Sequence, residues 1–200
     1  MSTSTTTPNS SYTIRQSRPS DIPKILSGHR TQYVDNDGFN EYFMSIVDDI
    51  LSSWTASHDP ALERFWVAEH STTAEFLGCV MLINKPSAVS ETEPVNENPD
   101  LNEPKESTRM GNSKEQDRTA RLRVLYVSPS ARGMGLGRAL VRLTTDFARE
   151  VGYRNVQLST CTVQGAAMRI YEQEGYGEVS WEESEMFGMR LRHVMLELGL

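Results

Sequence analysis

A glycine-rich heptapeptide holds the residues of this chain that are best suited to chemistry. It lies between an apolar stretch that ends at Val127 and a helical pattern that continues to Val151. Glycines let backbone N–H groups approach a ligand closely, and the N–H groups that begin a helix carry partial positive charge. An arginine at each end adds cationic charge. We therefore predict that a pyrophosphate binds at Arg132, Gly133, Met134, Gly135, Leu136, Gly137 and Arg138.

Two common nucleotide-binding patterns do not fit this segment. A P-loop ends in GK[ST], and its lysine is missing here; a dinucleotide fingerprint that starts at Gly133 needs a third glycine where Arg138 stands. A third pattern, [Q/R]xxGxG, fits from Arg132 to Gly137. It is the acetyl-CoA pyrophosphate loop of the GNAT superfamily of N-acetyltransferases, which the segment resembles. Such proteins place a strand before the loop, as at Leu125, Tyr126 and Val127.

A second segment, in the expected order, strengthens the resemblance. Residues 164–176 are similar to the family's NxxAxxxYxxxGF pattern at Ala167, Tyr171 and Gly175, while Gln164 replaces Asn and Tyr176 replaces Phe. Both the order and the spacing of the two motifs match. The chain is therefore identified as a member of this superfamily over residues 12–198, with residues 86–118 outside the resemblance.

The resemblance implies a mixed α/β (α+β) fold with a mostly antiparallel sheet of about seven strands flanked by helices. It implies acetyl-CoA as co-substrate, with no metal ion. Main-chain N–H groups near residues 125–127 would hold the acetyl carbonyl, and loss of one such donor typically costs about 3 kcal/mol in the barrier. The family pattern also places Gln164 and Ala167 at the cofactor.

Tyr171 stands where the family has the general acid that protonates the departing sulfur. The alternative is a packing or positioning role, because a thiol with a pKa near 8.5 already leaves tolerably as the thiolate. Tyr176 is interpreted as a core residue.

The attacking amine needs a proton acceptor. Deprotonating a lysine-like ammonium at pH 7 costs roughly 4 to 5 kcal/mol. Many relatives place a glutamate on the central strand, but Arg121 stands at the equivalent position here, so no base can be carried over. The remaining candidates for the general base are Glu41, Glu69, His29 and His193. Each of them can also be interpreted as an ordinary surface or capping residue.

Three further side chains bear on the acceptor. Tyr33 and Phe39 are candidates for aromatic pocket walls, although aromatic residues at helical spacing are more often core. Arg123 could pair with an acceptor carboxylate or form a salt bridge at the sheet edge.

Within the superfamily, the chain looks most similar to the acetyltransferase half of bacterial MarR–GNAT fusion proteins. The residues that carry this likeness are 29–33, 38–39, 64–69 and 120–123. The sequence contains no winged-helix half, so we do not expect the DNA-binding function of those fusions.

The elements that must position these residues follow from periodicity. The first half predicts a strand over 12–18, a helix from Ile22, a second helix over 38–54 with an acidic outer face, and a hairpin of strands 64–69 and 75–84. In the next strand, Leu122, Val124 and Tyr126 alternate with Arg123, Leu125 and Val127. A helix over 136–151 then ends at Gly152, followed by a strand over 155–161, a helix over 164–174 and strands near 176–181 and 190–198.

Composition sets the remaining boundaries. At 200 residues we expect one domain over 12–200, with a disordered tail at 1–11 and a disordered insertion at 86–118, where Pro, Ser, Asn and Glu dominate. A net charge of -7 argues against nucleic acid, and no apolar run approaches the roughly 20 residues that cross a bilayer. Neither a signal nor a transit peptide is predicted. We expect a cytoplasmic monomer or homodimer with Cys79 and Cys161 as buried thiols.

The leading hypothesis is an acetyl-CoA-dependent N-acetyltransferase that acts on the primary amine of a small molecule by direct attack in a ternary complex. A protein or peptide N-acetyltransferase is the related alternative. A noncatalytic acyl-CoA sensor is the alternative from a different functional class. It stays open because the sequence does not locate a general base.

Overall fold

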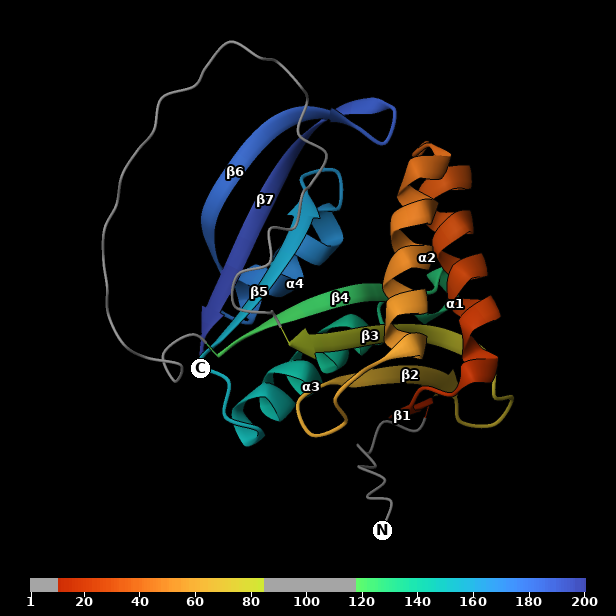
Figure 1. The fold of residues 1–200 in the computed structure, drawn as a ribbon. Helices are drawn as coiled ribbons and strands as arrows, with labels where there is room; N and C mark the ends of the chain where they lie inside the picture. Colours follow the sequence, from red (N-terminus) through yellow and green to blue (C-terminus); the bar gives the residue numbers. More distant parts are fainter. Residues whose placement is uncertain (1–10, 85–117) are drawn as a thin grey trace.

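The computed structural model describes residues 11–84 and 118–200 of the chain. One mixed sheet of seven strands runs through the molecule, with helices on both faces (Figure 1). This confirms the predicted fold class. The predicted tail and insertion fall almost entirely outside the described residues.

The elements agree closely with the expected order. The first half contains β1 (Tyr12–Gln16), η1 (Pro19–Asp21), α1 (Ile22–His29), η2 (Arg30–Asn36), α2 (Glu41–Ala56), β2 (Arg64–His70) and β3 (Phe76–Asn84). The second half contains β4 (Thr119–Val127), η3 (Pro129–Ala131), α3 (Leu136–Glu150), β5 (Asn155–Cys161), α4 (Gly165–Gln173), β6 (Gly177–Met186) and β7 (Met189–Gly199).

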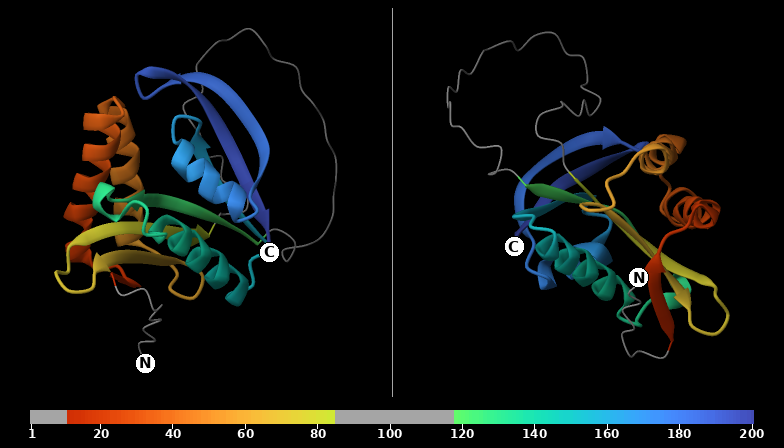
Figure 2. Two further views of the ribbon diagram at one scale, coloured as in Figure 1. Left: turned by 180° about the vertical axis from the view of Figure 1, so that it is seen from behind. Right: turned by 60° about the horizontal axis from the view of Figure 1, so that its bottom comes forward.

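Two antiparallel halves of the sheet meet at one short parallel junction. The strand order is β1-β2-β3-β4-β5-β7-β6, and only β4 and β5 are parallel. These two strands pair over three residues each, Thr119–Arg121 with Asn155–Gln157. Beyond that point they separate, and the two halves of the sheet splay apart, as Figure 2 shows. The sheet therefore opens toward the C-terminal end of β4.

Each face of the sheet has its own hydrophobic core. In β2, Trp66 and Ala68 pack on the face covered by α3 and α4, while Phe65 and Val67 pack on the face covered by α1 and α2. This alternation is the period of two that a strand buried on both faces must show. Full burial of a large apolar side chain stabilises the fold by about 1.5–3 kcal/mol, so both helical layers are held firmly.

Helix boundaries follow local backbone chemistry. The second helix begins at Glu41, three residues later than predicted, because Gly38 adopts a left-handed φ of 78° and Asn40 caps the helix by accepting from the Tyr42 N–H at 3.2 Å. The predicted end of α3 is confirmed, since Gly152 takes a left-handed φ of 84° directly after the C-cap.

The regular alternation expected for residues 122–127 is wrong at Val124. The register of β4 against β3 shifts there: Arg123 pairs with Met81 and Tyr126 pairs with Cys79. Val124 has a φ of 54°, which a β-branched residue rarely adopts. A β-bulge inserts one extra residue and reverses the facing of those that follow. Tyr126 therefore packs on the α1 and α2 face rather than beside Leu122.

The last hairpin is longer than predicted. β6 runs on to Met186, and a tight turn at Phe187 and Gly188 leads into β7. Both turn residues have positive φ, 57° and 84°, as the favoured two-residue hairpin turns require. Phe-Gly lacks the usual Asn or Asp signal of such turns, which explains the early predicted end. The π-helix η2 had no expected counterpart.

Candidate active site

The glycine-rich loop lies at the end where the sheet opens. It follows β4 and leads into α3, with Gly135 as the N-cap. Gly133 and Gly135 have φ values of 78° and 73°, and a Cβ at either position would meet no atom within 4 Å. The first turn of α3 offers N–H groups without partners inside the helix. The loop therefore presents bare backbone and a helix N-terminus to open space, which suits a pyrophosphate.

The two arginines of the loop are held in different ways. Arg132 donates to the Oε1 of Gln32 at 2.5 Å. Arg138 forms an ion pair with Glu174, which also accepts from Arg142 at 2.8 Å. Burial alone would raise the pKa of Glu174, but the hydrogen bonds from Arg142 and Arg138 outweigh it and keep that pKa below its usual value. Two guanidinium groups thus share one carboxylate, and this edge of the loop keeps an excess of positive charge.

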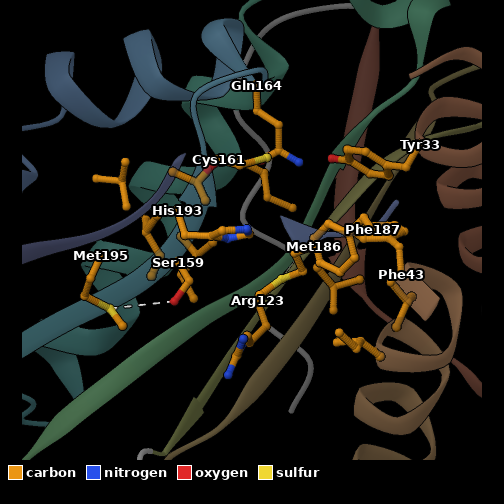
Figure 3. Close-up of a pocket in the computed structure, with 18 of the residues that line it drawn as sticks. Tyr33, Phe43, Arg123, Ser159, Cys161, Gln164, Met186, Phe187, His193 and Met195 are labelled. Atoms are coloured by element: carbon orange, nitrogen blue, oxygen red, sulfur yellow. Dashed lines mark hydrogen bonds between the residues drawn. The ribbon is translucent and has the colours of Figure 1, made fainter. Parts of the chain in front are cut away.

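A cavity of about 660 Å³ lies where β4 and β5 have separated. Its floor comes from Leu122 to Leu125 of β4 and Leu158 to Cys161 of β5, and its sides come from α2 and the β6–β7 hairpin (Figure 3). The loop residues 132–138 are not among its lining residues. β4 runs from this cavity to the loop, and its edge toward β5 is unpaired after Arg121, so an extended ligand lying along that edge can reach both.

An aromatic wall closes one side of the cavity. Tyr33 of η2 and Phe43 of α2 have ring centroids 4.6 Å apart, and the Phe187 ring lies 5.2 Å from that of Phe43. Phe39 is buried behind them, stacked on Phe187 at 5.0 Å. Of the two aromatic candidates, Tyr33 therefore lines the cavity and Phe39 supports it from the core.

Tyr171 reaches the cavity from α4. Its side chain is buried, and burial raises the pKa of its phenol well above the usual value, so the phenol stays protonated at neutral pH. The position of α4 depends on Gly137, where an added Cβ would come within 2.8 Å of the Ile170 Cδ1. Tyr176 packs beside Tyr171 in the core, as expected, with ring centroids 5.7 Å apart.

The bulge shapes the wall made by β4. Val124 and Leu125 line the cavity, whereas Tyr126 and Val127 do not. The Cys79 thiol donates to the Val124 carbonyl at 3.2 Å, and burial raises the pKa of that thiol, which keeps it a donor. The edge of β4 that faces the gap is not paired with β5 beyond Arg121. An extended ligand chain can pair with this edge as an added strand would.

The remaining cofactor residues predicted from the second motif occupy different places. Gln164 lines the cavity at the N-cap of α4, where its Oε1 accepts from the Thr160 hydroxyl at 2.7 Å. Ala167 is partly buried against the core. Arg123 lines the cavity on β4, and Arg121 is buried on the same strand.

Tertiary structure separates the four candidate bases. Glu69 bonds to Arg15 at 2.9 Å and Glu41 bonds to Arg30 at 2.6 Å, and neither lines the cavity. His29 lines the cavity, but burial lowers its pKa to about 4 and its Nδ1 is bonded to the Ile25 carbonyl at 2.8 Å. His193 also lines the cavity. Only the two histidines therefore lie at the site.

Comparison with known families identifies the fold. The model of the Acetyltransferase (GNAT) family matches residues 27–176, which include the glycine-rich loop and Tyr171. The chain belongs to this family. The match covers the β4 and β5 strands on which the site is built.

Curated relatives match this GNAT chain over shorter segments. N-acetyltransferase 8F1 of Rattus norvegicus is 41% identical over 63 residues, which are 32% of this chain and 28% of the relative. N-acetyltransferase 8 of Homo sapiens is 42% identical over 52 residues, 26% of this chain and 23% of the relative. The matched segments thus span about a quarter of the length of these relatives.

Solved structures share the whole architecture. A GCN5-related N-acetyltransferase from Kribbella flavida superposes with a TM-score of 0.66 at 18% identity, covering 97% of this chain and all of the other. A phosphinothricin acetyltransferase from Sinorhizobium meliloti, solved with acetyl-CoA, has a TM-score of 0.65 at 16% identity, covering 96% and 89% of the two chains. At these identities the likeness concerns the fold.

Sequence reasoning missed the contribution of the β6–β7 hairpin to this GNAT site. Trp181, Glu182 and Met186 line the cavity, but the predicted strand near 176–181 included only Trp181 of these three. Nothing in their local pattern distinguishes them, because the splay of the sheet brings them over β4. Among the residues that the structure describes, no group of three or more His, Cys, Asp or Glu side chains could hold a metal ion. Nor is any described helix long and apolar enough to span a membrane.

Proposed function

We propose that this GNAT chain is an N-acetyltransferase that transfers the acetyl group of acetyl-CoA to a primary amine of a small molecule. The observation that carries the proposal is the separation of β4 from β5 after Arg121, with a cavity of about 660 Å³ between the separated strands and the glycine-rich loop at the end of β4. Cavities of roughly 300–1,000 Å³ are typical of small-molecule sites. The acetyl-CoA complexes of two similar structures support the choice of co-substrate.

We assign a separate role in acetyl transfer to each group of residues along β4 and the loop. The loop at residues 132–137 binds the pyrophosphate, with Arg138 supplying charge nearby, and the open edge of β4 pairs with the extended arm that carries the thioester. At the bulge, main-chain N–H groups near Leu125 donate hydrogen bonds to the oxyanion that forms when the amine attacks. Preorganised donors of this kind contribute about 3 kcal/mol each to transition-state stabilisation.

Tyr171 donates the proton that the departing sulfur needs. Its pKa is raised by burial, so the phenol is fully protonated and available as a donor at neutral pH. The high pKa makes tyrosinate costly, so the phenol must recover its proton as the amide forms. Tyr171 therefore acts as a relay between the nitrogen and the sulfur.

Direct attack by the amine fits the state of both cysteines. Burial raises the pKa of the Cys161 thiol to about 11 and raises that of Cys79 further. A covalent acetyl-cysteine step needs a thiolate, and neither residue supplies one near pH 7. The acetyl group therefore passes from sulfur to nitrogen in one ternary complex.

The walls of the cavity favour an amine on an apolar skeleton. Tyr33, Phe43 and Phe187 provide aromatic contact area, while Asp49 and Glu182 also line the cavity and their carboxylates attract an ammonium group. A protein acceptor is the alternative, and it enters the test below. The resemblance to the MarR–GNAT half, the cytoplasmic location and the monomeric or dimeric state remain predictions.

The test is thiol release from acetyl-CoA over a panel of arylalkylamines, polyamines, amino acids and short peptides. We expect turnover with one class of small amines and loss of turnover in Tyr171→Phe. Turnover with peptides alone would show that the acceptor is a protein or peptide rather than a small molecule. Calorimetric binding of acetyl-CoA with no turnover across the panel would favour the noncatalytic sensor.

A further inference from the structure

The destination of the ammonium proton is the open question of the proposed reaction. At neutral pH an alkylamine enters the cavity as an ammonium ion, and its nitrogen cannot attack until one proton leaves. Glu41 and Glu69 are engaged in ion pairs away from the cavity. His29 lies at the cavity, but its pKa of about 4 makes it a weak proton acceptor. The acceptor of the proton must come from another wall.

His193 lies on that other wall, in the middle of β7. It pairs in register with Cys161 of β5 and with Glu182 of β6, so its side chain shares one row with theirs across the sheet. Figure 3 shows the imidazole projecting from β7 toward Met186 and Phe187. The Phe187 ring meets it edge-on, with centroids 6.0 Å apart at 69°. The His193 imidazole therefore lies in the row formed with Cys161 of β5 and Glu182 of β6, and it contacts Phe187 of the aromatic wall.

The Nε2 atom of His193 is buried and has no hydrogen-bond partner within residues 11–84 and 118–200. A buried polar atom without a partner destabilises the fold, so its retention calls for a group that arrives from outside. In the tautomer with hydrogen on Nδ1, Nε2 offers a lone pair to a donor in the cavity. An ammonium group is such a donor.

We propose that His193 is the general base that takes the proton from the acceptor's ammonium group. The inference rests on the proposed N-acetyltransferase function and adds a catalytic residue to it. The ammonium gives one proton to Nε2, the freed lone pair forms the C–N bond at the acetyl carbonyl, and the C–S bond breaks. The sulfur takes the Tyr171 proton, the second nitrogen proton restores Tyr171, and imidazolium releases its proton to solvent.

The charges around the cavity favour this transfer. The charged side chains in its lining are Asp49 of α2, Glu182 of β6 and Arg123 of β4, so two carboxylates face one guanidinium. Glu182 lies on the strand next to His193, in the register position opposite it. A nearby carboxylate stabilises an imidazolium when it forms. The other titratable groups of the lining are His29, Tyr33, Tyr42, Cys161 and Tyr171.

The test compares wild-type and His193→Gln protein with 2-phenylethylamine and its less basic β,β-difluoro analogue. With the basic amine we expect kcat to fall about 10²- to 10⁴-fold, the usual contribution of general acid–base catalysis. With the fluorinated amine, of which a far larger fraction is already neutral at the assay pH, the deficit should shrink at least tenfold. The calorimetric Kd for acetyl-CoA should stay at the wild-type value.

His58→Gln is the matched control. His58 is an exposed histidine stacked on Trp54 at 4.0 Å, outside the cavity lining, so its substitution should leave both amines at wild-type rates. If His193→Gln does not fold, His193→Asn takes its place in the same comparison.

Two results would overturn the assignment of His193 as the base. One is wild-type turnover by the folded variant. The other is an equal loss with both amines, which would indicate positioning rather than proton transfer. If wild-type protein acetylates no amine while binding acetyl-CoA, the proposed function itself fails, and His193 as base fails with it.

Discussion

Replacing Gly135 by alanine tests whether the left-handed backbone of the loop creates the acetyl-CoA site. Gly135 has a φ of 73° and nothing within 4 Å of an added Cβ, so the substitution introduces no clash and acts only through the backbone. A left-handed conformation costs a non-glycine residue about 1–2 kcal/mol. That penalty must appear either in the free energy of unfolding or in ligand binding.

The penalty appears in a different measurement depending on whether the substituted loop keeps its left-handed conformation. If the loop keeps its conformation, the free energy of unfolding falls by about 1–2 kcal/mol and the Kd for acetyl-CoA is unchanged. If the loop relaxes, stability is kept and the Kd rises about 5- to 30-fold, because each 1.4 kcal/mol is a factor of ten. The sum of the two changes is therefore expected to be about 1–2 kcal/mol.

Urea unfolding and titration calorimetry with acetyl-CoA measure the two terms. Gly135→Asn should show a smaller sum, because asparagine tolerates the left-handed region better than alanine does. Gly177→Ala is the control, since Gly177 has open space around it and no left-handed φ. If Gly135→Ala matches wild type in both measurements, the loop does not need this conformation and the reasoning is refuted.

Three further predictions concern the cavity and the fold. Tyr171→Phe should lower kcat and leave the Kd for acetyl-CoA unchanged, as steady-state kinetics and calorimetry will report; an unchanged kcat would contradict the acid role. Glu182→Gln should raise KM for cationic amines a few-fold and leave KM for neutral amines unchanged. An equal rise in KM for both kinds of amine would contradict electrostatic attraction by Glu182. Asp21→Asn breaks the buried pair with Arg15, at 2.7 Å, and should cost about 3–5 kcal/mol and lower Tm by about 10 °C. The Arg15 hydrogen bond lowers the pKa of Asp21, so this stability is present above about pH 4 and is lost as the pH falls through the folded pKa; a difference from wild type that does not shrink in acid would contradict it.

Much of the fold could be predicted because local rules decide it. The strand before the loop, the glycines of the loop and the amphipathic helix after it lie next to one another in the chain, so their spacing alone predicts a strand, a turn and a helix. The second motif likewise places Tyr171 on a short helix that follows a strand. Both motifs lie within the segment that matches the GNAT family.

Interactions between distant residues decided the rest. The bulge at Val124 depends on the register of β4 against β3, which no pattern within β4 reveals, and it determines that Leu125 rather than Tyr126 faces the cavity. The sequence left Glu41, Glu69, His29 and His193 as equal candidates. Ion pairing and burial then separated them.

The sequence by itself determined the order of the elements, the position of the glycine-rich loop and the place of Tyr171 on α4, because these follow from spacing along the chain. Tertiary structure alone decided which side chains meet in the cavity. The reason is physical: β4 and β5 are paired for three residues and then separate, and that opening brings the β6–β7 hairpin and α2 together around one space. His193 belongs to the site only because the sheet splays.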